Sequence, residues 1–514
     1  MRETATIAVA NHYIRIFGFY EQFIATVVRP FCTMNLSKTA KKPIPGTRQQ
    51  KWVITHVFAR SNYDRSEFRL PAEMLKEFLE FAAYKGYKES RLKIIDEPVL
   101  EGKDVSFEFQ PGFENMRPGQ PEWVNYMLDE GFLKINNAAT GNGKTYMSIH
   151  AMVRLGKLTV ITLQPRYVIN FIKELHRVVK LDPGDVLLWE NDLTSLAKVI
   201  EDGTFTPKII VIPMSRIEVF LRKAKEDRFQ MSLDEVYRII NPGLRIIDEG
   251  HEAPHQIFLS LMYGNLKKTF VLSATLKADD PFTNKVYKII YPLRFRLKDA
   301  EPENYIDVVA YLYRLNIRRH RIKTEQFGTY NDKAFEESIL KSEALTKFYF
   351  EVANKMFKEY YLAEGRRREG TKCLFFFSRV NMCDTMLELF RKEYPDMDIE
   401  TFTGEDSKKK DQKDKYLRHE VIITTPNSCG TGKDIPGLIT TCCMHTVSST
   451  QSNKQMIGRL RDISGKFNGE IPPIFAFGVC VDLGKHTEYL SKREVAFADK
   501  QKSFKRINSE CSLE

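Results

Sequence analysis

Two series of short apolar segments alternate with stretches of helical periodicity, and this alternation restricts the chain to one class of fold. The segments are rich in β-branched residues, which is typical of strands buried on both faces of a parallel sheet. The first series begins near residue 113 and the second near residue 371. The pattern therefore predicts two tandem α/β domains. The segments read FLKINNA, LTVITLQ, PKIIVIP, LRIIDE and KTFVLSAT in the first series, and CLFFFS, DIETFT, HEVIITT, LITTCCMH and IFAFGVCVD in the second.

The residues before the first series predict a smaller accessory domain of the α+β type. Thr6–Val9 and His12–Phe17 have the pattern of strands, and Pro71–Tyr84 has the apolar spacing of an amphipathic helix. Lys38–Gln50 is basic and contains turn-forming residues, so we expect an exposed loop there. The predicted division is an accessory domain over 1–112, a first α/β domain over 113–297, a linker and the start of the second domain over 298–345, and the rest of that domain over 346–514.

The composition is that of a basic globular protein. Hydrophobic residues make up 43% of the chain and charged residues 28%, with 78 Lys and Arg against 67 Asp and Glu, a net charge of +11. Excess positive charge favours a polyanionic partner because binding to phosphates releases counterions, although many proteins of this charge bind no nucleic acid. The eight cysteines form no metal-binding pattern, so we expect a reducing cytoplasmic location and no structural metal. No apolar run reaches the roughly 18 residues of a membrane span, which predicts a soluble protein without a membrane partner.

A glycine-rich loop follows the first strand of the first series. Residues 138–145 read AATGNGKT and lie between that strand and a helix expected to begin near Tyr146. Backbone N–H groups of such a loop, together with the positive end of the helix, bind phosphate. A chance GNGKT is the alternative, but the strand–loop–helix setting argues against it. We expect Lys144 to reach the β- and γ-phosphates, Thr145 to bind Mg²⁺, and Thr140, Gly141, Asn142 and Gly143 to surround the nucleotide phosphates.

Two carboxylates follow a later strand of the same domain. Leu244–His251 reads LRIIDEGH, so an apolar strand delivers Asp248 and Glu249 to the edge of the sheet. In a nucleotide hydrolase we expect Asp248 to hold Mg²⁺ and Glu249 to polarise the attacking water. Acidic residues at strand ends are common, but their position downstream of a phosphate loop in one domain indicates a nucleotide-hydrolysis site.

Asp248–His251 is a variant of the DEAD/DEAH box, and the chain resembles superfamily 2 helicases over roughly residues 113–490. Ser273–Thr275 resembles their motif III, which links the nucleotide state to the nucleic-acid cleft. Arg117–Gln120 resembles the upstream R-P-x-Q element, whose glutamine contacts adenine, so the resemblance implies ATP as the nucleotide. Thr162–Pro165 resembles motif Ia, a contact region for the phosphodiester backbone.

The second domain carries matching segments of the same family. In motif V the Gly-Thr region touches the strand and Asp434 senses the nucleotide, which implies nucleotide contacts at Gly432 and Asp434. In motif VI, which includes Gln455, an arginine meets the γ-phosphate across the cleft. The segments are Leu374–Ser378 for motif IV, Thr403–Glu405 for the stretch after it, Thr424–Thr425 with Gly430–Asp434 for motif V, and Gln455–Arg461 for motif VI.

Two positions depart from the family pattern. Motif VI reads QxxGRxxR in the family, whereas position 462 is Asp here and the second arginine is Arg461. Arg459 is therefore the expected arginine finger, and a nucleotide-binding role for Arg461 stays open. The third letter of the box is Gly250 rather than Ala or Cys, a small residue that should preserve the chemistry. His251 is interpreted as a coupling residue hydrogen-bonded across the cleft, not as a metal ligand.

The layout of one small N-terminal domain before two RecA-like domains is similar to that of UvsW-type phage recombination and branch-migration DNA helicases. This resemblance implies an ATP- and Mg²⁺-dependent helicase or translocase that remodels forks, junctions, D-loops or R-loops in a host cytoplasm. Branched or single-stranded DNA is the expected partner, replication or recombination proteins are candidate partners, and a monomer is the candidate state. An RNA helicase and an ATP-switched nucleic-acid clamp are the alternatives. Three basic runs are candidates for phosphate contacts or for solvated surface: Arg318–Arg321, Arg366–Arg368 and Lys408–Lys415.

Overall fold

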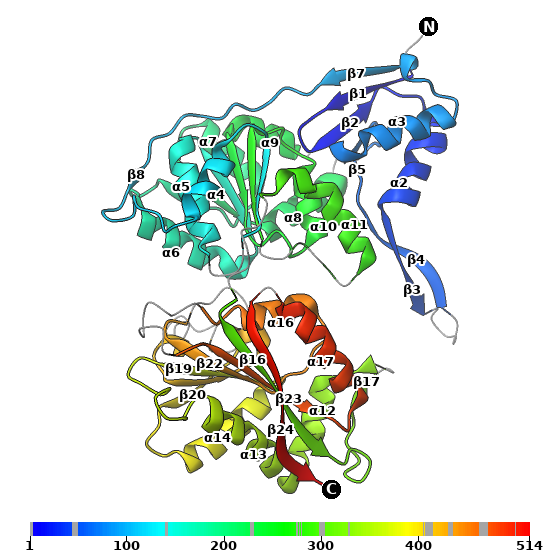
Figure 1. Cartoon of the computed structure of the whole chain (residues 1–514). Coiled ribbons are helices and arrows are strands. Elements are labelled where there is room, and N and C mark those ends of the chain that lie inside the picture. Colours follow the sequence, from blue (N-terminus) through cyan, green and yellow to red (C-terminus); the bar gives the residue numbers. More distant parts are fainter. Residues whose placement is uncertain are drawn as a thin grey trace. The chain divides into compact units, whose positions relative to one another are not determined.

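The chain forms two compact units, residues 1–299 and 300–514, and each is considered by itself (Figure 1). The computed structural model describes residues 4–43, 50–138, 142–226, 231–273, 276, 278, 280–297, 304–326, 329–404, 406, 415–429, 435–461, 471–498 and 500–514. Within these ranges no helix combines the length and the apolar character needed to cross a membrane.

A six-stranded parallel sheet forms the centre of the first unit, with strand order β12-β13-β10-β14-β15-β9. The five strands predicted for the first series are confirmed. Successive residues of a strand enter opposite core layers: in β13, Ile209 and Val211 join one layer and Ile210 and Ile212 the other. Apolar side chains are needed on both faces because both are covered. The strands are β9 (Leu133–Asn136), β10 (Thr159–Leu163), β12 (Val186–Leu188), β13 (Ile209–Pro213), β14 (Leu244–Ile247) and β15 (Lys268–Leu272).

Eight helices accompany this sheet in the described part of the unit. They are α4 (Gln120–Leu128), α5 (Lys144–Leu155), α6 (Val168–Val178), α7 (Leu193–Glu201), α8 (Met214–Glu226), α9 (Leu233–Ile240), α10 (Pro254–Leu261) and α11 (Pro281–Ile290). A short antiparallel pair, β8 (Glu108–Phe109) with β11 (Val179–Lys180), lies outside the main sheet.

The N-terminal residues form a five-stranded mixed sheet with order β5-β6-β2-β1-β7, here called the accessory part. The strands predicted at Thr6–Val9 and His12–Phe17 and the helix predicted at Pro71–Tyr84 are confirmed. A continuous helix runs from α1 (Glu21–Phe23) through a π-helical turn (Ile24–Val28) into α2 (Arg29–Leu36). The other elements are β1 (Ala5–Val9), β2 (Tyr13–Phe17), β5 (Arg60–Ser61), β6 (Glu67–Pro71), α3 (Leu75–Tyr84) and β7 (Leu92–Asp96).

A β-hairpin replaces the loop expected at Lys38–Gln50, so that prediction was wrong for the described residues. Strand β3 (Ser37–Pro43) pairs antiparallel with β4 (Gln50–Val57), while residues 44–49 lie outside the described ranges. The polar sequence of β3 has low strand propensity by itself. Its partner is rich in aromatic and β-branched residues, and pairing decides the conformation. In Figure 1 the hairpin extends beyond the end of α2.

The accessory part is joined to the first α/β part by buried polar contacts. Arg69 of β6 forms an ion pair with Asp234 of α9 at 2.6 Å and donates to the Met262 carbonyl at 2.7 Å. His12 Nε2 lies 2.9 Å from Thr269 Oγ1. Burial, reinforced by the nearby Arg245, lowers the pKa of His12 to about 3, so its ring is neutral.

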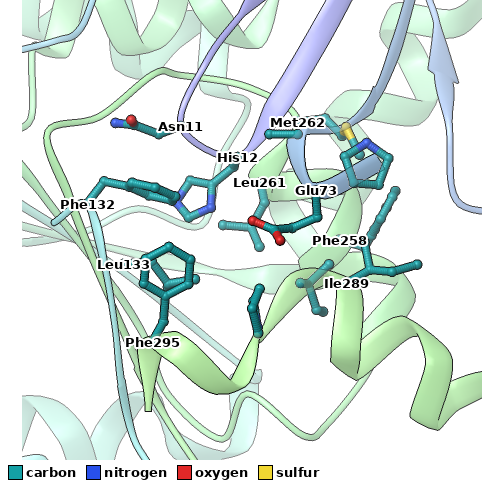
Figure 2. A pocket seen from close by; sticks show the side chains of 14 residues that line it. Asn11, His12, Glu73, Phe132, Leu133, Phe258, Leu261, Met262, Ile289 and Phe295 are labelled. Carbon is teal, nitrogen blue, oxygen red and sulfur yellow. The ribbon is translucent and has the colours of Figure 1, made fainter. Parts of the chain in front are cut away.

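A small cavity marks the same boundary (Figure 2). The rings of His12, Phe132 and Phe295 form part of its wall, with Glu73 nearby. The His12 and Phe132 rings meet edge to face with centroids 5.1 Å apart. The cavity measures about 20 Å³, which is room for roughly one water molecule. It is a packing feature of the boundary and is too small for a nucleotide.

The second unit contains a seven-stranded parallel sheet with order β20-β21-β19-β22-β23-β16-β24. The five strands predicted for the second series are confirmed. Two more strands, from the two ends of the unit, lie side by side: β16, within the range predicted as linker and domain start, and the C-terminal β24 (Figure 1). The strands are β16 (Ile306–Leu315), β19 (Lys372–Phe376), β20 (Ile399–Phe402), β21 (Val421–Thr424), β22 (Leu438–Cys443), β23 (Ile474–Cys480) and β24 (Gln501–Leu513).

Helices and one short hairpin complete the described part of this unit. They are α12 (Asp332–Leu340), α13 (Glu343–Tyr360), α14 (Val380–Glu393), α15 (Pro426–Cys429), α16 (Thr450–Ile457), α17 (Gly484–Phe497), and β17 (Glu325–Gln326) with β18 (Thr329–Tyr330).

Candidate active site

The glycine-rich loop connects β9 to α5, and the R-P-x-Q segment packs against it. Gly143 precedes the helix with φ +79°, and a Cβ there would lie 2.7 Å from Gln120 Nε2. Gln120 is buried; its Nε2 donates to the Asn142 carbonyl at 3.0 Å and its Oε1 accepts from the Arg117 N–H at 3.0 Å. Glycine at 143 therefore serves both the turn and the close approach of Gln120. Thr140 and Gly141 lie outside the described residues.

Lys144 and Thr145 occupy the first turn of α5, at the positive end of the helix. Both side chains are half-buried. Lys144 Nζ donates to the Ala138 carbonyl at 3.1 Å, so the ammonium group folds back over the start of the loop. The first-turn N–H groups of a helix have no partners further along it, which favours an anion at this position.

Asp248 and Glu249 follow β14 as the sequence predicted. The Asp248 N–H donates to the Thr162 carbonyl at 3.2 Å, and the Glu249 N–H donates to Asp248 Oδ1 at 2.9 Å. Glu249 has φ +50°, a left-handed conformation that costs a non-glycine residue about 1–2 kcal/mol. The tight turn keeps the two carboxyl groups adjacent at the end of the strand.

Burial and the neighbouring Glu249 carboxylate raise the pKa of Asp248 to about 7, although Lys144 acts in the opposite direction. Carboxylates held together in this way favour a cation. Mg²⁺ commonly binds through one or two protein oxygens and otherwise through water and substrate phosphates. Asp248 and the Thr145 hydroxyl fit that donor set. The described residues contain no group of three or more His, Cys, Asp and Glu side chains that could hold a metal ion.

Gly250, which replaces the Ala or Cys of the family pattern, lies in a closely packed position. A Cβ at this residue would stand 2.5 Å from Val271 Cγ1, and the Tyr291 hydroxyl donates to the Gly250 carbonyl at 2.8 Å. The Gly250 N–H also donates to the Leu272 carbonyl at 2.9 Å. The close contact with β15 therefore explains why residue 250 is glycine. Because Gly250 directly follows Glu249, a larger side chain at position 250 would also displace the turn that holds the two carboxylates.

His251 lies between the carboxylates and the start of motif III. Its Nδ1 is 3.0 Å from Ser273 Oγ and 3.3 Å from Glu249 Oε2, all within the first unit. The Tyr287 hydroxyl donates to the His251 carbonyl at 2.6 Å. Burial lowers the pKa of His251, which favours the neutral ring. Thr275 lies outside the described residues.

Glu252, which the sequence analysis did not single out, connects the box to the segment after motif Ia. Its buried carboxylate pairs with Arg166 and accepts from the Tyr167 hydroxyl at 2.7 Å. The Arg166 guanidinium lies 5.0 Å from the centre of the Tyr167 ring. A single acidic residue beyond the box carries no pattern that identifies this partner, so only the three-dimensional contact reveals it.

In the second unit, the described part of motif VI lies at the end of α16. Arg459 is buried, and its Nε donates to the Gln455 carbonyl at 3.3 Å. Arg461 is half-exposed and its Nη1 donates to the Gly458 carbonyl. Gly432 and Asp434 of motif V lie outside the described residues.

A buried polar cluster surrounds the end of motif IV, and its two acidic members come from the range predicted as the linker and start of the second domain. Asp332, at the start of α12, accepts from Ser378 Oγ and from the Thr446 N–H at 2.9 Å. His445 Nδ1 lies 2.8 Å from the same carboxylate. Glu336 accepts from the Ser378 N–H at 2.8 Å. These contacts fix the turns after β19 and β22.

The basic runs have different positions. Arg366 Nε donates to the Tyr360 carbonyl at 2.7 Å and Arg367 pairs with Glu420 at 2.6 Å, so both contribute to the structure of their own unit. The run Arg318–Arg321 lies in a turn in which the three arginines are exposed and His320 is half-buried. The run Lys408–Lys415 lies outside the described residues except for Lys415.

Comparison with solved structures identifies the architecture. The chain resembles S. cerevisiae Dbp5 bound to RNA and ADP BeF3, with a TM-score of 0.50 and 14% identity, covering 77% of this chain and 91% of that chain. It also matches T4 UvsW with a TM-score of 0.34 and 14% identity, covering 98% and 99%. No family model and no curated protein matches the chain. The likeness to Dbp5 concerns the fold: this chain has two tandem RecA-like α/β parts, preceded by a small β-rich part.

Proposed function

We propose that this chain is a nucleic-acid-stimulated ATPase that acts as a helicase or translocase on DNA. The observation that carries the proposal is the placement of Lys144 in the first turn of α5 and of Asp248 and Glu249 directly after β14, with Lys144 interacting electrostatically with Asp248. A helix terminus that favours phosphate beside carboxylates that favour a cation is the arrangement a magnesium nucleotide requires. Dbp5, which shares the fold, is bound to ADP BeF3 and RNA in its structure.

The proposed roles follow from these positions. Lys144 binds the β- and γ-phosphates, and the first-turn N–H groups of α5 hold the phosphate oxygens. Asp248 and Thr145 hold Mg²⁺, which supplies positive charge to the transferring phosphoryl group. Glu249 orients and polarises the attacking water. Gln120 supports the loop through Asn142 and, with Arg117, forms the side on which we place adenine.

The second unit completes the proposed ATPase. Arg459 is the proposed arginine finger, and an arginine in that role is worth on the order of 10³–10⁵ in rate. Gln455 belongs to the same catalytic segment. Gly432, Asp434 and Arg461 are proposed nucleotide contacts.

Branched DNA is the proposed substrate. The net charge of +11 supports a polyanionic partner, and the accessory part, which is fixed to the first α/β part, is the proposed contact for branched structure in the DNA. RNA is the second candidate, favoured by the RNA bound to Dbp5.

The test is the ATPase rate in the presence of single-stranded DNA, duplex DNA, a four-way junction and single-stranded RNA at one salt concentration. The proposal predicts stimulation by DNA, greatest with the junction. Stimulation by RNA alone would move the function to RNA remodelling. A rate unaffected by every nucleic acid would contradict a nucleic-acid-stimulated ATPase.

A further inference from the structure

A groove lies between the accessory part and α10 of the first α/β part. Its volume is about 470 Å³, within the roughly 300–1,000 Å³ of sites that bind small organic groups. The base of the β3–β4 hairpin, the start of α2, β5 and α10 all contribute to it. Its lining residues include Arg29, Thr33, Val57, Arg60, Phe68 and His255.

The groove combines basic and apolar side chains. Arg29, Arg60 and His255 line it, and no Asp or Glu is among its described lining residues. Arg60 is anchored because its Nη2 donates to the Leu221 carbonyl. Ile54 lines the groove and is 48% exposed, so its apolar surface is open to an occupant.

We propose that this groove binds one nucleotide unit of the nucleic-acid strand on which the enzyme acts. The inference rests on the proposed function and names where the accessory part contacts the substrate. A nucleotide carries an anionic phosphate beside an apolar ring, which matches a pocket with arginine at its rim and apolar residues in its wall. An acidic peptide would match the basic residues of the groove by its charge alone. A nucleotide matches the basic residues by its phosphate and the apolar wall by its ring, so we favour a nucleotide as the occupant.

The groove is also connected to the candidate active site. His255 lies in the first turn of α10, shortly after the box, and its Nε2 is 3.3 Å from the Val57 carbonyl of the hairpin. Phe58 packs edge to face on His255 and on Phe258, with centroids 5.1 and 4.9 Å apart. A nucleotide in the groove would therefore lie against α10, the helix that follows the Asp248–His251 box.

The test uses the full chain and two variants that change exposed groove residues. Arg29→Glu reverses the charge at the rim, and Thr33→Trp fills the groove with a bulky ring; both residues are exposed, so folding should survive. Lys76→Glu, an exposed residue of α3 outside the groove, is the matched charge control. Thermal melting checks that each protein is folded.

The readout is the dissociation constant of a labelled single-stranded DNA, measured over a range of salt concentrations. Arg29→Glu should weaken binding about tenfold and reduce the slope of log K against log salt by about 0.7, the value for one single-strand phosphate contact. Thr33→Trp should weaken binding by a similar factor, and Lys76→Glu should keep the wild-type slope.

The outcomes separate this inference from the proposed function. If the wild-type chain binds DNA and all variants bind with unchanged affinity and slope, the groove assignment is overturned and a protein segment becomes the alternative occupant. If the wild-type chain binds neither DNA nor RNA, the proposed function and the groove assignment both fail.

Discussion

Replacing Arg69 with alanine removes the most buried ionic contact between the accessory part and the first α/β part. Arg69 is 6% exposed and its guanidinium lies 2.6 Å from both Asp234 and Glu67. It also donates to the Met262 carbonyl at 2.7 Å. Arg69→Ala would leave the Asp234 carboxylate with little solvent and without its cation, while the hydrogen bond from the Gly264 N–H at 2.9 Å remains.

The expected loss follows from the burial of this pair. Removing one partner of a buried ion pair costs about 3–5 kcal/mol. For the 1–299 unit, an unfolding entropy of about 2.1 cal/mol/K per residue gives about 0.6 kcal/mol/K. The midpoint of thermal unfolding should therefore fall by about 5–8 °C, as measured by differential scanning calorimetry.

Arg294→Ala is the matched control, because Arg294 also pairs with a residue of the accessory part. Its partner is Glu73, and the Arg294 side chain is 61% exposed. An exposed ion pair contributes roughly 0–1 kcal/mol, so Tm should fall by less than about 2 °C. Equal shifts for Arg69→Ala and Arg294→Ala would refute the argument that burial of the Arg69 contact fixes the accessory part.

Three further changes test the site and the boundary. Gly250→Ala places a Cβ 2.5 Å from Val271 Cγ1, so it should lower the free energy of unfolding by about 1–3 kcal/mol and lower the kcat of ATP hydrolysis. An unchanged melting curve together with an unchanged ATPase rate would contradict this prediction. Burial lowers the pKa of His12 to about 3, whereas the pKa of an unfolded histidine is about 6.5. As the pH falls below the unfolded pKa, the His12 contribution to the free energy of unfolding should therefore decline by about 1.4 kcal/mol per pH unit. In urea unfolding at pH 7 and pH 5, His12→Gln should show a smaller loss than the wild type, and equal losses would argue against a buried neutral ring. Arg459→Ala should reduce hydrolysis by on the order of 10³-fold or more and Arg461→Ala much less, whereas the reverse order would assign the finger to Arg461.

The sequence was sufficient for most of the two large sheets, because their strands are continuous apolar runs. It was insufficient where tertiary pairing decides the conformation. The polar residues of β24 form an edge strand because they pair with β16, and the segment Ser37–Pro43 becomes extended because β4 lies beside it. β16 itself is apolar, but its polar neighbours concealed it within a segment interpreted mainly as a linker.

The candidate site, like the sheets, could be predicted from the sequence only where local patterns determine the position of a residue. Spacing within a strand–loop–helix unit placed Lys144, and the apolar run of β14 placed Asp248 and Glu249. Glu252 and Asp332 could not be found from the sequence, because each acts through partners distant in the chain, such as Arg166 at 86 positions from Glu252. A motif is identified by residue types at fixed spacing within one segment. The contacts of Glu252 and Asp332 depend instead on which turns at the strand ends lie close together in the folded chain.

The most direct test of the central claim is a comparison of ATP binding and ATP hydrolysis in Glu249→Gln, with Lys144→Ala as the reference for lost binding. Removing a group that activates water typically costs 10²–10⁴ in rate, so Glu249→Gln should bind ATP as the wild type does and retain about 1% or less of its turnover. Lys144→Ala should lose affinity for ATP. Turnover of Glu249→Gln close to that of the wild type would contradict the assignment of the catalytic carboxylate and, with it, the proposed ATPase site.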